Sequence, residues 1–433
     1  MTLSFPRKLL LLLAVQQLAF LLLFAPVREP DSGSFITVAE QAVATGSFSA
    51  ETRLPGYPAF LAAVYSVFGP ADLPVAVVQH LLGLLLWYLL ARRLESRRQQ
   101  AFFAGLFALD LLYSSYQHAI LSDFLFSVLL CFSALAAGRR KGELRPSDAL
   151  LAGFFAALAL LTKPALKFFP VFILPFFFAA PGPFKARLKF AAAFLALPLL
   201  AANLWCLRNY RETGRYALLP METYHYIGRV ATHMEFPPGS VTEPFFRAQM
   251  PGGRAHRDQR SEIAHRAEAE MRQAGIDTAT LDSEFAAIFR LSILRRPFTY
   301  LRESLAEVLY FFLSAHNLYA KHGLGDRLPV SAREALRDRN YGGLFLKLAA
   351  SLHPFYWAVA GLFFWFCGAN WRRLRAEGDL LFLYSLGLVA YIALVSAFAN
   401  EGLARYRTAV QPLMLFFCAV LLARLFPGGE APR

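Results

Sequence analysis

Ionisable side chains beside long apolar runs are the residues of this chain that could do chemistry. Asp31 follows the first apolar run, and Asp123 opens a later one. Lys163, Arg208 and Arg405 each stand at an end of an apolar run. Charges in such places cost free energy unless they have a partner or a function, so we treat these five residues as site candidates.

Carboxylates and cations together predict a particular kind of chemistry. A carboxylate can accept the proton of an attacking hydroxyl group. Fixed cations can stabilise a phosphate leaving group as its charge develops, and the planar guanidinium of arginine matches the geometry of phosphate oxygens. Two carboxylates and several cations on one side of a membrane therefore predict a site for a hydroxyl acceptor and an anionic donor.

The composition indicates a membrane protein. Of the 433 residues, 57% are hydrophobic and 17% are charged, whereas soluble proteins average about 45–50% and about 25%. This excludes a disordered chain, a secreted disulfide scaffold and an ordinary cytosolic enzyme. The four cysteines lie far apart in apolar runs and are expected to be buried. We predict an all-α polytopic membrane protein with about ten transmembrane helices.

The positive charge reports the topology of the chain. Lys and Arg number 44 against 30 Asp and Glu, a net charge of +14. Much of the excess lies in short loops between apolar runs, at residues 92–98, 139–145, 185–189 and 372–375. Basic loops at alternate helix ends are typical of the cytoplasmic side of a membrane, so we expect both termini there and do not expect a nucleic-acid partner.

Four regions follow from this topology. Residues 1–207 form an N-terminal transmembrane module, whose first outer loop, residues 28–70, carries interfacial helices. A small extracytoplasmic domain covers residues 208–299. Residues 300–350 are an interfacial segment, because Arg302, Glu303 and Glu307 interrupt the apolar run from Tyr300 to Leu318 and leave open whether that run spans. Residues 351–433 supply the C-terminal transmembrane helices.

A series of short motifs resembles the glycosyltransferase C superfamily, most closely the bacterial relatives of protein O-mannosyltransferase and of the lipid A aminoarabinose transferase. In chain order the motifs are Asp31 with Phe35, Ala39 and Gly46; Arg53–Leu54–Pro55–Gly56–Tyr57–Pro58; Ser122–Asp123–Phe124; Thr162–Lys163–Pro164; Arg208–Asn209–Tyr210 with Gly214; and Glu401, Arg405, Tyr406 and Pro412. The chain departs from many members at one position, where Ser32 follows Asp31 in place of an Asp-Glu pair.

The resemblance implies a function and a role for each residue. It implies a membrane enzyme that moves a hexose or pentose from a polyprenyl-phosphate donor, with inversion, to a hydroxyl group of a glycolipid, polysaccharide or protein. The reaction is expected on the outer face of a bacterial inner membrane. The implied residues are Asp31 as base, Asp123 as a second catalytic acid, Lys163, Arg405, Arg53 and Arg208 at the donor phosphate, and Tyr57, Glu401 and Tyr406 at the substrates.

A nucleotide-sugar donor has no support, because the sequence contains neither a Walker A segment nor a DxD triplet. Several of the candidate residues could instead have a purely structural role. Asp123 could cap its helix, and Lys163 could extend its ammonium group to the interface. Arg405 could form an ordinary ion pair with Glu401. Asp110 lies inside the expected span Phe102–Tyr116, where we expect a hydrogen-bonded residue of the bundle.

Metal use and two competing functions stay open. The isolated histidines give no zinc site, and no cofactor is required, although a divalent cation that bridges an acid and the phosphate is an alternative. A transporter or flippase of a lipid-linked saccharide would carry charges or broken helices near the middle of the membrane. A scaffold without activity would need no such set of charges. The charges at the outer helix ends favour the enzyme.

Overall fold

All regular secondary structure in the residues that the computed structural model describes is helical, apart from one isolated parallel bridge between Val27 and Ala119. These residues are 5–48, 53–140, 142–219, 223–250, 260–315, 318, 337–340, 347, 352–399 and 404–427. The predicted all-α class is confirmed.

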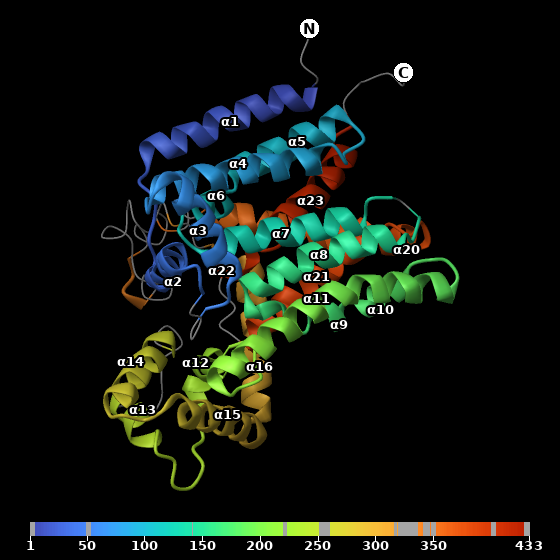
Figure 1. Cartoon of the computed structure of the whole chain (residues 1–433). Helices are drawn as coiled ribbons and strands as arrows, with labels where there is room; N and C mark the ends of the chain where they lie inside the picture. Colours follow the sequence, from blue (N-terminus) through green and yellow to red (C-terminus); the bar gives the residue numbers. More distant parts are fainter. Residues whose placement is uncertain are drawn as a thin grey trace.

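The apolar helices of the chain run side by side and form a bundle (Figure 1). They are α1 (Phe5–Leu23), α4 (Asp72–Ala91), α5 (Arg97–Leu109), α7 (Ser122–Ala137), α8 (Pro146–Thr162), α11 (Phe184–Thr213), α20 (His353–Ala376), α21 (Leu380–Phe398) and α23 (Gln411–Leu425). Local signals set several ends: Ser96 and Gln99 form a capping box at α5, and Pro146 occupies the first turn of α8.

Four of the described helices, α1, α4, α11 and α21, are long and apolar enough to cross a membrane by length and composition. Several shorter apolar helices accompany them, among them α7, α8 and α23. The estimate of about ten spans therefore stays a prediction. The run expected as one span at Phe102–Tyr116 is divided, because Asp110 ends α5 and caps α6 (Leu111–Gln117) by accepting a hydrogen bond from the Tyr113 N–H at 3.1 Å.

Short helices gather at one end of the bundle, on the left in Figure 1. They are α2 (Ser32–Thr45), α3 (Gly56–Phe68), α6 and α22 (Ala404–Arg407). The connections α4–α5 and α7–α8, which carry basic residues, lie at the opposite end, as does the α10–α11 connection. The basic residues expected in a loop at 185–189 lie in the first turns of α11 instead. Between α8 and α11 the chain forms η1 (Pro164–Leu166), α9 (Phe169–Phe172) and α10 (Leu174–Ala179).

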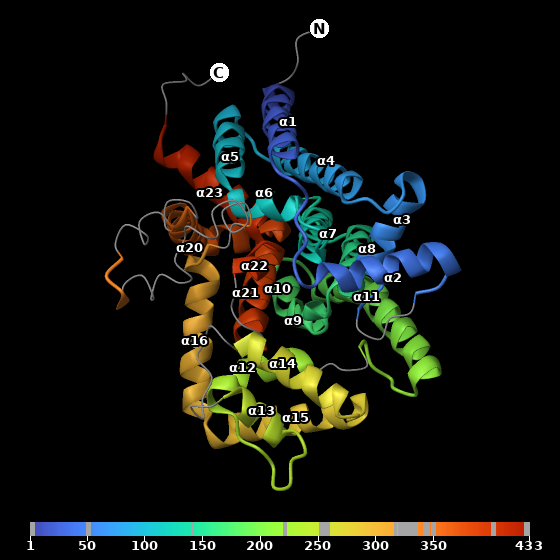
Figure 2. The ribbon, with the colours of Figure 1, turned by 90° about the vertical axis from the view of Figure 1, so that its left-hand side faces the viewer.

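A separate group of helices follows α11 and has a core of its own. It consists of α12 (Tyr224–Val230), η2 (Ala231–His233), α13 (Glu243–Gln249), α14 (Arg260–Gln273) and α15 (Thr278–Arg295). Its buried side chains include Phe246, Met271 and Phe285. We call it the outer domain, after the extracytoplasmic position that the sequence predicts for it. The long helix α16 (Pro297–Leu313) leads from it back to the bundle, as Figure 2 shows.

Candidate active site

Five charged side chains, from five separate places in the sequence, form one continuous chain of ion pairs. Lys163 Nζ lies 2.5 Å from Asp123 Oδ1, and Arg405 Nε lies 3.1 Å from Asp123 Oδ2. Arg405 Nη2 then lies 2.8 Å from Asp31 Oδ2, and Arg53 Nη2 lies 2.8 Å from Asp31 Oδ1. Cations and anions alternate along this cluster, which we call the five-charge chain and which carries one more cation than anions.

Burial differs along the five-charge chain. The Asp123 side chain is only 2% exposed, whereas that of Asp31 is 31% exposed. Burial alone would raise the pKa of the Asp31 carboxyl, but the guanidinium groups of Arg405 and Arg53 outweigh it and hold that pKa well below its usual range. Asp31 is therefore ionised at neutral pH, and it is the carboxylate more open to a substrate.

Two antiparallel helices bring Asp123 and Lys163 together. Asp123 lies in the first turn of α7, and Lys163 directly follows the last residue of α8. The two helices pack against each other and are joined at their other ends by the basic loop. Since α7 has 16 residues, at about 1.5 Å each, the site lies about 24 Å from that loop. An anion at a helix N-terminus and a cation at a C-terminus also suit the helix dipoles.

The isolated β bridge places Asp31 beside Asp123. The Val27 N–H donates to the His118 carbonyl at 3.0 Å, and the Ile120 N–H donates to the Val27 carbonyl at 2.9 Å. Val27 precedes Asp31 by four residues, and Ala119, its bridge partner, precedes Asp123 by four. The two acidic residues therefore leave the same short stretch of paired backbone. No periodicity in the sequence predicts this bridge.

Arg53 is positioned by α2 and α3. Its Nε donates to Ser34 Oγ at 2.8 Å, and its guanidinium lies 4.4 Å from the centre of the Phe35 ring. A Cβ atom on Gly56 would lie 2.5 Å from Thr162 Oγ1, so only glycine allows this close approach to the end of α8. Phe35 and Gly56 belong to the sequence motifs, whereas Ser34 belongs to none of them.

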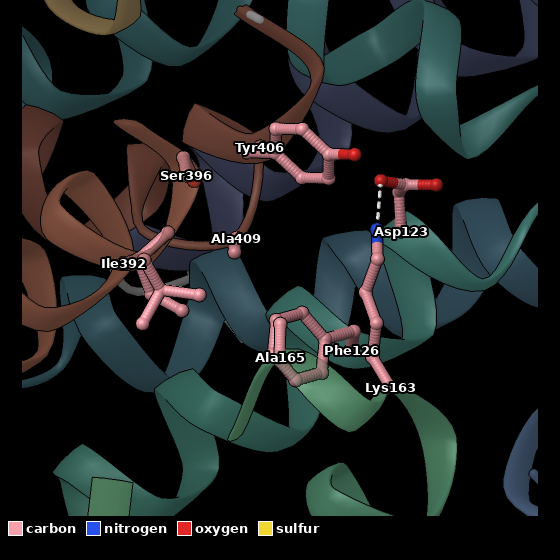
Figure 3. Close-up of a pocket in the computed structure, with 9 residues that line it drawn as sticks. Asp123, Phe126, Lys163, Ala165, Ile392, Ser396, Tyr406 and Ala409 are labelled. Carbon is pink, nitrogen blue, oxygen red and sulfur yellow. Dashed lines mark hydrogen bonds and ion pairs between the residues drawn. The ribbon is translucent and has the colours of Figure 1, made fainter. Parts of the chain in front are cut away.

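A pocket opens beside the Lys163–Asp123 ion pair, between α7, α21 and the residues around α22 (Figure 3). Its lining is mostly apolar and comprises Asp123, Phe126, Lys163, Ala165, Ile392, Val395, Ser396, Tyr406 and Ala409. The Tyr406 hydroxyl points toward Asp123, and Lys163 Nζ lies 5.1 Å from the centre of the Tyr406 ring. The hydroxyl of Ser396, which the sequence motifs do not include, adds a polar group to the wall.

The remaining predicted site residues lie elsewhere. Tyr57 is fully buried and donates a hydrogen bond to Gln79 Oε1 at 3.3 Å, so it stabilises the helices around the site and is not exposed to a substrate. Arg208 donates to the Phe48 carbonyl and forms an ion pair with Glu212 at 2.6 Å, outside the five-charge chain. Glu401 lies outside the described residues.

The carboxylates do not offer a ready metal site. Each of the four carboxylate oxygens of Asp31 and Asp123 accepts a hydrogen bond from a lysine or arginine. A divalent cation between the two acids would have to replace Arg405, which bridges them. Within the described part of the chain, no group of three His, Cys, Asp or Glu side chains could hold a metal ion. The arrangement does not fit a bound metal.

A family model matches residues 52–205, and its description is dolichyl-phosphate-mannose-protein mannosyltransferase. The match agrees, over this segment, with the family that the sequence motifs predict. The matched segment includes Arg53, Asp123 and Lys163, and it places this part of the chain among membrane glycosyltransferases. Asp31 and Arg405 lie outside it. No curated protein matches the chain.

Solved structures are similar to this chain at low sequence identity. The oligosaccharyltransferase of Archaeoglobus fulgidus in its apo form has a TM-score of 0.53 and 15% identity, over 97% of this chain and 50% of that one. The chain therefore spans about half the length of that protein. ArnT from Cupriavidus metallidurans bound to undecaprenyl phosphate has a TM-score of 0.42 and 14% identity, over 96% of this chain and 78% of that one.

Proposed function

We propose that this protein is an inverting glycosyltransferase with about ten transmembrane helices. It moves a sugar from a polyprenyl-phosphate donor to a hydroxyl group of a glycolipid, polysaccharide or protein on the outer face of the membrane. The observation that carries the proposal is the five-charge chain, in which two carboxylates alternate with three cations beside an apolar pocket. A phosphate group needs such cations to balance its charge.

The position of the site supports an outer location. Asp123 and Lys163 lie at the ends of α7 and α8 that face away from the basic loop at residues 139–145. Basic loops favour the cytoplasmic side, so the opposite helix ends face outward. A bacterial inner membrane is the location that the sequence motifs imply.

Binding of the donor requires an exchange of partners. In the free protein, both bridging N–H groups of Arg405 are bound to carboxylates. A donor phosphate competes for Arg405 and Lys163, since each can donate charge-assisted hydrogen bonds to its oxygens. When Arg405 turns to the phosphate, Asp31 loses one of its two cations and becomes a better proton acceptor. Donor binding thus prepares the base.

The transfer is a single displacement. The acceptor oxygen attacks the sugar carbon that bears the phosphate, and its proton passes to the Asp31 carboxylate. The bond from that carbon to the phosphate oxygen breaks, and the polyprenyl phosphate leaves with the bonding electron pair. Lys163 and Arg405 stabilise the added negative charge on the leaving group. One displacement at the sugar carbon inverts its configuration.

The other residues have supporting roles in this proposal. Asp123 keeps Lys163 and Arg405 in place and orients the acceptor or the cations. Arg53 and Arg208 are secondary phosphate contacts, and Tyr406 lies against the donor in the pocket. Glu401 acts at the substrates, and Tyr57 contributes indirectly by supporting the loop that carries Arg53.

The test uses the purified protein in lipid vesicles that contain a radiolabelled polyprenyl-phosphate sugar. Transfer of label to an acceptor that carries free hydroxyl groups, with the inverted anomer detected by NMR, supports the enzyme. Movement of the labelled lipid between the two leaflets without transfer would instead support a flippase. Addition of a chelator should leave transfer unchanged, because Arg405 occupies the place between the two acids.

A further inference from the structure

Two buried arginines lie outside the five-charge chain, one on α12 and one on α22. The Arg229 side chain is 0% exposed, and Arg407 is 1% exposed. Burying a guanidinium group is costly unless its N–H groups find partners. Both arginines donate to carbonyl groups at the ends of helices next to the site.

Arg407 lies two residues after Arg405 on the single turn of α22. Since each helical residue turns the chain by about 100°, the two side chains leave α22 on nearly opposite sides. Arg407 Nη1 donates to the carbonyls of Phe311 at 3.0 Å and Phe312 at 2.5 Å, and its guanidinium lies 4.6 Å from the centre of the Tyr356 ring. These carbonyls belong to the last turn of α16, where no helical N–H is available to them. Arg407 therefore caps α16.

Arg229 belongs to α12 of the outer domain and caps α21 in the same manner. Its Nε donates to the Ala397 carbonyl at 2.9 Å, and its Nη2 donates to Ser304 Oγ at 2.7 Å. Beside it, the Tyr300 hydroxyl donates to the Phe398 carbonyl at 2.5 Å. Ala397 and Phe398 are in the last turn of α21, so an arginine and a tyrosine take up two of its free carbonyls.

Acidic residues of α16 hold Arg229 in this position. Arg229 Nη1 lies 3.3 Å from Glu303 Oε2, and Arg260 Nη2 lies 2.8 Å from the same oxygen. Arg260 Nη1 also lies 3.0 Å from Glu307 Oε1. The acids that interrupted the apolar run in the sequence are therefore paired with arginines of the outer domain. Helix α16 joins the outer domain, the end of α21 and α22 into one assembly.

This assembly reaches the pocket directly. Val395 and Ser396 line the pocket and precede Ala397 in the last turn of α21. Arg405, on the far side of α22 from Arg407, bridges the two acids. We propose that Arg229 and Arg407 are positioning residues, which fix the end of α21 and α22 so that Arg405 meets Asp31, Asp123 and the donor phosphate. This inference rests on the proposed function of the five-charge chain.

The test is a pair of double-mutant cycles with Arg405 as the common partner. Arg407→Gln and Arg229→Gln should each lower kcat/KM for the polyprenyl-phosphate donor by about tenfold to a hundredfold, the cost of a small misplacement. In an Arg405→Lys background, where a single ammonium replaces the bridging guanidinium, each second change should cost less than about twofold, because residues that act through one another are not additive. Arg407→Lys keeps the charge and should restore part of the loss.

A matched control and two opposing results make the test decisive. Arg93 also donates to carbonyls beyond a helix end, those of Gly138 and Arg139, but at the opposite end of the bundle, so Arg93→Gln should leave kcat/KM unchanged. If Arg405→Lys impairs transfer and the second changes still act at full size, Arg229 and Arg407 are only structural, and the inference is overturned. If Arg405→Lys has no effect, the proposed function of the site fails, and the inference fails with it. Should Arg407→Gln not fold, Arg407→Lys takes its place in the cycle.

Discussion

Asp31 and Arg405 lie 374 residues apart in the chain, yet Asp31 Oδ2 accepts a hydrogen bond from Arg405 Nη2 at 2.8 Å. The Nε of the same arginine reaches Asp123 at 3.1 Å. One planar guanidinium thus joins the loop after α1 to the start of α7. A phosphate that binds Arg405 has to compete with both acids, so the donor and the base are linked through a single side chain.

The first prediction concerns the base. Asp31→Asn keeps the size of the side chain and a hydrogen-bond acceptor but cannot take a proton, so transfer should fall by about 10²–10⁴-fold while donor binding persists. Asp123→Asn should be damaging but less complete, because Asp123 holds the cations. Both variants are compared in a transfer assay and a donor-binding measurement on the same purified samples. Substantial transfer by Asp31→Asn would move the role of base to Asp123.

The second prediction concerns the phosphate site. Lys163→Met and Arg405→Met should each weaken donor use by about tenfold to more than a hundredfold, since losing a charge-assisted contact costs about 1.5–3 kcal/mol. Lys167→Met is the control, because this exposed lysine follows Lys163 by four residues and does not line the pocket. Initial rates at limiting donor measure the effect. Full rates for both variants would place the phosphate elsewhere, with Arg53 and Arg208 as the next candidates.

The third prediction is a shift of the acid limb of the pH profile. Arg405 and Arg53 hold the pKa of Asp31 below its usual range, so the base stays ionised in mildly acidic solution. We therefore expect kcat/KM to fall only at a pH below the ordinary pKa of an aspartate, which is about 3.9. Arg53→Met removes one cation, so the pKa of Asp31 rises and the acid limb should move to higher pH. Arg28→Met removes an exposed partner of Asp72 and should leave the limb in place. If the acid limb is unchanged in Arg53→Met, the group whose ionisation produces this limb is not Asp31.

The fourth prediction tests the contact between α3 and α8. A methyl group on Gly56 would lie 2.5 Å from Thr162 Oγ1 and 2.8 Å from the Leu161 carbonyl, so Gly56→Ala must push the two helices apart. Arg53 and Lys163 would then separate, and both thermal stability and donor use should fall. Gly361→Ala is the control, since nothing lies within 4 Å of its added methyl and alanine favours a helix. Unchanged activity in Gly56→Ala would mean that this spacing is not critical.

The fifth prediction concerns orientation. In a background in which the half-buried Cys367 is replaced by serine, Val241→Cys should react with a membrane-impermeant thiol reagent in intact cells, because Val241 is exposed on the outer domain. Glu143→Cys, in the basic loop between α7 and α8, should react only after permeabilisation. The reverse labelling pattern would place the five-charge chain on the cytoplasmic side.

The sequence alone determined the type of protein and most of the site candidates. Composition and apolar runs depend on residues close in the chain, so they indicate helices and mark Asp31, Asp123 and Lys163 as charges at helix ends. The motif around Arg53 lies within the segment that the family model matches. The local pattern was sufficient for these features, because a charged residue beside an apolar run can be recognised in the sequence however the helices pack.

Only the tertiary structure decided which charges meet. Arg208 has the same kind of position in the sequence as Lys163, yet it pairs with Glu212, while Arg405 bridges two acids. Arg229 and Arg407 carry no signal in the sequence, because the carbonyls that they bind belong to helices distant in the chain. Hydropathy places a residue at a helix end, but which neighbour lies within hydrogen-bond reach depends on how the helices pack, and that packing is fixed by contacts along their whole length.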